Sequence, residues 1–186
     1  VMLLISALST LALTYKEQKT KDNILEHLKR SFPDEPTIYY LSRLIDKYFD
    51  LVALLSARFD IDILKAAALF SEPNRISESD LFSTPDGIND LAIALLDING
   101  ETSLYDQCSG VSSFLIKAGL KSRPNALVGV EINTECRILS NIRSSIVDMP
   151  LTIIQGDAIN PAFDGVKFDR IFCNPPIGMK FQAIQN

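Results

Sequence analysis

The sequence predicts a parallel α/β sheet of the doubly wound type, preceded by a small all-α region. Two observations predict this fold. From residue 100 onward, short apolar runs alternate with stretches of helical spacing, which is typical of parallel strands joined by helices. Residues 1–70 contain no glycine and carry apolar residues at helical spacing, which indicates a helical bundle. A break at residues 71–74 divides the two, so we expect a helical N-terminal domain over 1–75 and an α/β domain over 76–186.

The composition is that of an ordinary globular protein: 186 residues, 47% of them hydrophobic and 22% charged. The net charge of −5 excludes an overall basic surface for nucleic acid, so any such contact must be local. Cys108, Cys136 and Cys173 have no paired spacing, and there is only one histidine, so the sequence predicts no metal site and no disulfide framework. This cysteine usage suggests a reducing, cytoplasmic location.

The first thirteen residues are apolar, but they are too short to span a membrane and no basic residue precedes them. We therefore expect them to form a packed helix and expect no membrane partner. Two further helical stretches follow, around residues 24–28 and 38–55. The two prolines of the segment 31–36 should separate these stretches, because prolines so close together stop a helix.

In the α/β region, Thr84 followed by Pro85 predicts a helix start, with Thr84 as the N-cap. Four strands are then expected in the spatial order 3-2-1-4, the fourth of them an apolar, buried strand at an exposed or intermolecularly paired edge. Helices should join the first three strands. The expected strands span 103–105, 126–130, 151–154 and 168–173, and the expected helices run from Gly110 to about 118 and from about 135 to 147.

Acidic residues follow the first three strands, namely Asp106, Glu131 and Asp157. Because the carboxyl ends of parallel strands meet at one rim, we expect these side chains to surround a ligand. A turn with one glycine follows Asp106, and an acid about 25 residues further on is placed to bind a ribose diol. The sequence offers no phosphate-binding lysine, so an acidic rim favours a cationic, phosphate-free adenosine ligand.

The fourth strand ends in Asn174-Pro175-Pro176. The prolines cannot donate to a sheet ladder and hold the preceding residue extended, so the asparagine amide should stand at the same rim. An amide carries both a donor and an acceptor and can hold an amino group. A Pro-rich turn without function is the alternative interpretation of this segment alone.

Taken together and in this order, the motifs resemble those of the S-adenosylmethionine-dependent, adenine-specific DNA methyltransferases. The resemblance is closest to the modification subunits of type I restriction-modification systems, and it covers roughly residues 80–180. It implies a Rossmann-like class I methyltransferase sheet, truncated here after strand 4. The motifs are Phe82-Ser83-Thr84-Pro85, Asp106-Gln107-Cys108-Ser109-Gly110, Val130-Glu131, Gly156-Asp157-Ala158 and Asn174-Pro175-Pro176.

The resemblance also implies roles for single residues. As the cofactor it implies S-adenosylmethionine, and as partners DNA and the specificity and restriction subunits. Asn174 and the Pro175 carbonyl would accept hydrogen bonds from the amino group of a flipped adenine, in the catalytic segment Asn174, Pro175, Pro176 and Ile177. The cofactor-binding residues would be Thr84, Asp106, Cys108 and Gly110 for the methionine part, Glu131 for the ribose, and Asp157 with the Ala158 amide for the adenine.

Two departures from the family pattern concern activity. Ser112 replaces a second glycine of the turn and is expected to crowd the cofactor, and Ile177 replaces an aromatic residue that would stack on the flipped base. We expect residues 1–186 alone to be inactive on DNA. A protein-glutamine or RNA methyltransferase, and a methyltransferase-like assembly module without catalysis, are the alternatives. The Thr-Pro segment and the helical region favour DNA.

Overall fold

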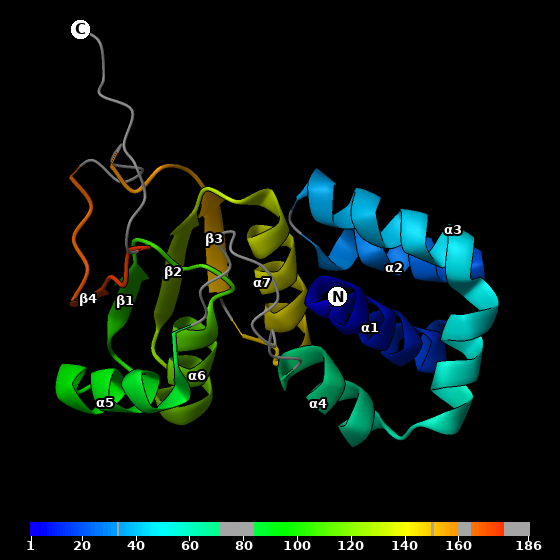
Figure 1. The fold of residues 1–186 in the computed structure, drawn as a ribbon, viewed down its shortest axis with the longest axis horizontal. Coiled ribbons are helices and arrows are strands. Elements are labelled where there is room, and N and C mark those ends of the chain that lie inside the picture. Colours follow the sequence, from blue (N-terminus) through cyan, green and yellow to red (C-terminus); the bar gives the residue numbers. More distant parts are fainter. Residues whose placement is uncertain (33, 71–83, 150, 160–164, 177–186) are drawn as a thin grey trace, which may run out of the picture.

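The computed structural model places a helical region beside a four-stranded sheet (Figure 1). It describes residues 1–32, 34–70, 84–149, 151–159 and 165–176. The helices are α1 (Met2–Gln18), α2 (Lys21–Ser31), α3 (Glu35–Arg58), α4 (Ile61–Phe70), α5 (Asp86–Leu96), α6 (Ser113–Ser122) and α7 (Thr134–Ile146). The strands are β1 (Ser103–Asp106), β2 (Ala126–Glu131), β3 (Leu151–Gln155) and β4 (Arg170–Phe172).

The sheet is parallel throughout and has the order β3-β2-β1-β4, which confirms the predicted order 3-2-1-4. The strand register places the carboxyl ends of neighbouring strands at the same level, as the predicted rim requires. Asp106, the last residue of β1, is level with Gly129 of β2 and Phe172 of β4, and Glu131 at the end of β2 is level with Gln155. The carboxyl ends of β1, β2 and β4 therefore lie side by side.

The fourth strand differs from the prediction. It spans only Arg170–Phe172 instead of residues 168–173, and Ile171 is 56% exposed. The expectation of a buried strand is wrong because, among the described strands, β4 pairs with β1 alone and forms an edge of the sheet. Phe172 is half-buried and stacks on Phe114 of α6, with ring centroids 3.9 Å apart. This contact anchors the strand end that leads to Asn174.

The apolar start of the chain forms the centre of the helical region. Ala7, Leu11 and Ala12 of α1 are fully buried, and α1 contacts both α3 and α4. The predicted packed helix is confirmed. No helix in the described part of the chain is both long enough and apolar enough to cross a bilayer. The predicted break is also confirmed, since α2 ends at Ser31 and α3 begins at Glu35.

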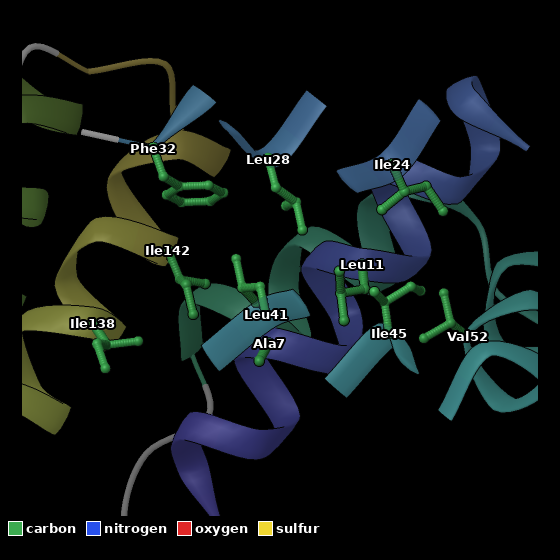
Figure 2. Packing of buried hydrophobic residues seen from close by; sticks show 10 residues of the cluster. All are labelled: Ala7, Leu11, Ile24, Leu28, Phe32, Leu41, Ile45, Val52, Ile138 and Ile142. Carbon is green, nitrogen blue, oxygen red and sulfur yellow. The ribbon is translucent and has the colours of Figure 1, made fainter. Parts of the chain in front are cut away.

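The core of the helical region extends into the α/β region through α7. Figure 2 shows Ile138 and Ile142 of α7 beside Phe32 and Leu41, in one cluster of buried side chains. In Figure 1, α7 lies between β3 and the helical region. The helical region thus supports the helix that follows β2. The expected domain boundary at residues 75 and 76 lies outside the described residues and stays a prediction.

Two helix starts differ from those expected. The helix α5 begins at Asp86 with Pro85 at the N-cap, so Thr84 is not its N-cap. The carbonyl oxygen of Pro85 accepts from the amides of Ile88 and Asn89, and this ring-restricted residue already has the extended geometry of a cap. The helix α6 begins at Ser113, not at Gly110. Thr84 and Gly110 are therefore both available to the rim.

Candidate functional site

The turn after β1 is fixed by a left-handed glycine and by hydrogen bonds from its own amides. Gly110 has φ of 54°, a left-handed conformation that glycine adopts without strain. The backbone N–H of Cys108 donates to Oδ1 of Asp106 over 3.1 Å. The amide of Ser109 donates to the carbonyl oxygen of Val130 over 2.9 Å, which ties the turn to β2. The turn is thereby held against the ends of both strands.

Ser112 also has a left-handed backbone, with φ of 57°, at a position where glycine would be unstrained. Its side chain is fully buried, and its Oγ donates to Oγ of Ser140 in α7 over 2.9 Å. Ser112 is not among the residues that line the hollow at the rim. The Ser112 hydroxyl is thus satisfied by α7, and the expectation that Ser112 crowds the cofactor stays a prediction.

Glu131 connects the end of β2 to two neighbouring loops. Its Oε2 accepts from the amide of Gly110 over 2.8 Å, and its Oε1 accepts from the amide of Asn133 over 2.6 Å. Burial raises the pKa of Glu131, and the backbone N–H bonds oppose that rise. Each carboxylate oxygen retains a second lone pair, so Glu131 can still accept hydrogen bonds from a ligand.

Asp106 is 2% exposed, and burial raises its pKa to about 7. The nearby Glu131 adds to the rise, while the bond from the Cys108 amide opposes it. A cation placed next to a buried carboxyl lowers its pKa again, because the cation stabilises the charged carboxylate. The site is thus electrostatically suited to a positively charged group.

Gln107 connects the first and third strand ends, a role that was not assigned to its side chain from the sequence. Its Nε2 donates to the carbonyl oxygen of Ala158 over 2.9 Å. Asp157, half-buried, accepts from the amide of Ile159 over 3.0 Å. The position of Gln107 directly after Asp106, the acidic residue that ends β1, is the sequence feature that could have indicated this role. The bond from Gln107 holds Ala158 next to the turn after β1, and the expected contact of the Ala158 amide with the adenine stays a prediction.

The most informative contact joins residues 90 positions apart. Nδ2 of Asn174 donates to Oγ1 of Thr84 over 3.1 Å. Pro175 and Pro176 are exposed, and Ile177 lies outside the described residues. A hollow lies at this contact, between Thr84, the turn after β1, the start of α6 and the segment after β4. It is lined by Thr84, Asp106, Cys108, Ser109, Val111, Ser113, Phe114 and Asn174.

Four of the predicted site residues, Thr84, Asp106, Cys108 and Asn174, thus line one hollow. Gly110, Glu131, Asp157 and Ala158 do not line it. Gly110 and Glu131 are hydrogen-bonded to each other in the turn after β1, and Ala158 is hydrogen-bonded to Gln107. Within the described residues, no group of three or more His, Cys, Asp or Glu side chains is arranged to hold a metal ion. The arrangement places the buried carboxyl of Asp106 in the same hollow as the Asn174 amide, whose oxygen is a spare acceptor.

Comparisons with known proteins agree with this architecture. Residues 71–186 match the family model described as N-6 DNA methylase. The type I restriction-modification system methyltransferase subunit from Streptococcus thermophilus is similar in structure, with a TM-score of 0.52 and 15% identity over 99% of this chain and 58% of that one. A putative class I S-adenosylmethionine-dependent methyltransferase from Listeria monocytogenes is also similar in structure. Its TM-score is 0.50 and its identity 14%, over 95% of this chain and 58% of that one.

No curated protein matches the chain. The two solved structures confirm the predicted fold, a class I methyltransferase sheet behind a helical N-terminal part. The chain spans 58% of the length of each of them.

Proposed function

The chain belongs to the N-6 DNA methylase family, and from this premise we propose that it forms the cofactor-binding part of an adenine-specific DNA methyltransferase. The methyl donor would be S-adenosylmethionine, and the protein would act with specificity and restriction subunits of a type I system in the cytoplasm. The contact between Asn174 and Thr84 carries the proposal, because it sets an amide at the rim beside the glycine turn.

The charged groups of the rim support the cofactor. S-adenosylmethionine supplies an electrophilic methyl group on a sulfonium and has no phosphate. Asp106 would hold the ammonium of its methionine part, since burial has raised the pKa of this carboxyl and a cation would relieve that cost. Glu131 would accept from the ribose hydroxyls with the lone pairs that Gly110 and Asn133 leave unused. Asp157 and the Ala158 amide would contact the adenine ring.

Asn174 would orient the target amine. With its Nδ2 donating to Thr84, the oxygen of the same amide remains as the acceptor, which fixes the polarity of the group that an incoming amine meets. That oxygen and the Pro175 carbonyl would accept the two amino hydrogens of adenine, so that the nitrogen lone pair points at the methyl group. Positioning and stabilisation of the positive charge on nitrogen then suffice, and no side-chain nucleophile is needed.

The family match favours DNA over RNA or a protein glutamine as the substrate. Ser112, one of the two residues that suggested a module without catalysis, has a structural partner in Ser140. The match to the N-6 DNA methylase family supports a catalytic protein over an assembly module without catalysis.

Replacing Glu131 with alanine tests the cofactor part of the proposal. We expect the mutation to weaken binding of S-adenosylmethionine by on the order of 1.5–3 kcal/mol, the loss of a charge-assisted hydrogen bond to a ribose hydroxyl. Isothermal titration calorimetry on the full-length protein measures this difference. Glu135→Ala is the matched control, because it removes the same charge from the exposed first turn of α7.

Glu131 also holds the amides of Gly110 and Asn133, so the thermal unfolding of each variant is recorded alongside. A folded Glu131→Ala protein that binds the cofactor as tightly as the Glu135→Ala protein would remove Glu131 from the site.

A further inference from the structure

Two cysteines meet at the rim. The Sγ atoms of Cys108 and Cys173 are 3.7 Å apart. Cys108 lies in the turn after β1, and Cys173 directly follows β4. These two strands are paired, with Asp106 level with Phe172, and the amide of Gln107 donates to the carbonyl oxygen of Phe172 over 3.3 Å. The two cysteines thus sit on adjacent, hydrogen-bonded segments, with their sulfur atoms at contact distance.

Both thiols are reachable from solvent, unlike the third cysteine. Cys173 is exposed and Cys108 is half-buried, whereas Cys136 is 4% exposed in α7. Cys136 is enclosed by Met2, Val111 and Leu139, in a different cluster of the core. The chain therefore contains its own internal control for thiol reactivity.

We propose that Cys108 and Cys173 are a modification site, at which a peroxide converts the two thiols to an intramolecular disulfide that stops methyl transfer. The disulfide would join the glycine turn to the segment that carries Asn174.

The chemistry balances with one peroxide for each pair of thiols. The sulfur of Cys173 attacks the peroxide, the O–O bond breaks, and sulfenic acid and water form, taking up the thiol proton. The sulfur of Cys108 then attacks the sulfenic sulfur. The S–S bond forms, the S–O bond breaks, and the hydroxyl leaves as a second water with the Cys108 proton. Both sulfurs are oxidised and the two peroxide oxygens are reduced.

The order of the two steps follows from the surroundings of each thiol. Cys173 is exposed and meets the oxidant first. Burial, together with the adjacent Cys173, raises the pKa of Cys108 to about 12, so Cys108 is a poor nucleophile toward a dilute oxidant in solution. Its advantage is position, since its sulfur already contacts that of Cys173. Cys108 is therefore the resolving thiol.

The disulfide would disturb the site because its atoms must move. The two sulfurs would approach from 3.7 Å to about 2.05 Å, the length of an S–S bond. Cys173 precedes Asn174, whose amide is bonded to Thr84, and Cys108 follows Asp106 in the turn. A misplacement of about 1 Å at a reacting group can lower a rate about 100-fold, which is the loss that we expect here. This consequence rests on the proposed function, whereas the disulfide itself does not.

Peptide mapping tests the disulfide. The full-length protein is treated with hydrogen peroxide, its remaining thiols are alkylated, and tryptic peptides are analysed by mass spectrometry. We expect a cross-linked pair of peptides containing Cys108 and Cys173 that dithiothreitol separates, with Cys136 still alkylated. The cross-link should be absent from both the Cys108→Ser and the Cys173→Ser variants and present in Cys136→Ser. Two alkylated thiols, a sulfinic acid at Cys173, or a bond between two chains would each overturn the proposal.

The methyl-transfer rate tests the consequence. Each variant is compared only with its own reduced form. We expect oxidation to lower the rate about 100-fold in the parent protein, with recovery in dithiothreitol, and to change the rate less than twofold in Cys173→Ser. A disulfide that forms without loss of rate would overturn the inhibitory role. A reduced parent protein without any methyl transfer would contradict the proposed function instead, while the peptide map would still decide the disulfide.

Discussion

Replacing Asn174 with alanine is expected to lower the rate of methyl transfer roughly 100- to 1,000-fold, the cost of removing one preorganised polar group from a reacting centre. The amide of Asn174 is held by Thr84 and would contact the adenine amine, not the cofactor. Its contribution should therefore be to the rate constant, with the dissociation constant for S-adenosylmethionine almost unchanged. Single-turnover methylation and calorimetry on the full-length protein measure the two quantities separately.

Asn125→Ala provides the matched control for this prediction. Asn125 is an exposed amide before β2, and its Nδ2 donates to the carbonyl oxygen of Glu101 over 2.8 Å, away from the rim. This variant should methylate at the parent rate. If Asn174→Ala and Asn125→Ala have the same rate, the segment after β4 is only a Pro-rich turn and the amine-binding site has been placed wrongly.

Replacing Asp34 with alanine is expected to lower the free energy of unfolding by about 3–5 kcal/mol, the usual cost of breaking a buried ion pair from one side. Asp34 receives an ion pair from Arg137 over 3.2 Å and a hydrogen bond from Asn141 over 2.6 Å, both from α7. It also caps α3 by accepting from the amide of Thr37 over 3.2 Å. The Arg137 side chain is only 10% exposed, so the mutation leaves an enclosed charge without its counter-ion.

Asp46→Ala is the matched control, because it removes the same charge from an ion pair that is exposed instead of buried. Asp46 pairs with Lys21 over 2.6 Å, but their side chains are 54% and 43% exposed, so the loss should stay below about 1 kcal/mol. Urea unfolding followed by circular dichroism measures both variants at pH 7. Equal losses for the two variants would mean that the contact between Asp34 and α7 does not stabilise the helical region against the sheet.

The sheet order could be predicted from the sequence because it depends on local patterns and one general rule. Short apolar runs separated by helical spacing define parallel strands, and right-handed crossovers leave few orders open. Acidic residues at three strand ends then predict the rim at which a ligand would bind, and this prediction is untested. The same local reasoning was wrong for β4, because burial of a strand depends on what lies next to it. It was wrong for Thr84 because Pro85 itself occupies the cap position.

The contacts that organise the site could not be predicted, since they join distant residues. Asn174 meets Thr84 across 90 positions, and Asp34 meets Arg137 across the junction of the two regions. Only tertiary packing brings such side chains together. The hydrogen bond from Ser112 to Ser140 of α7 is a further long-range contact that no local pattern predicts. The roles of the cofactor-binding residues remain predictions that the variants above test.

The most direct test of the proposed function is to identify the methylated product. The full-length protein is incubated with S-adenosylmethionine labelled in its methyl group and with duplex DNA, RNA or a protein substrate, and each product is hydrolysed to nucleosides or amino acids. We predict label only from the DNA reaction and only as N6-methyldeoxyadenosine. Label on cytosine, on RNA or on a glutamine side chain, or no transfer to DNA in the presence of the specificity subunit, would contradict the proposed function.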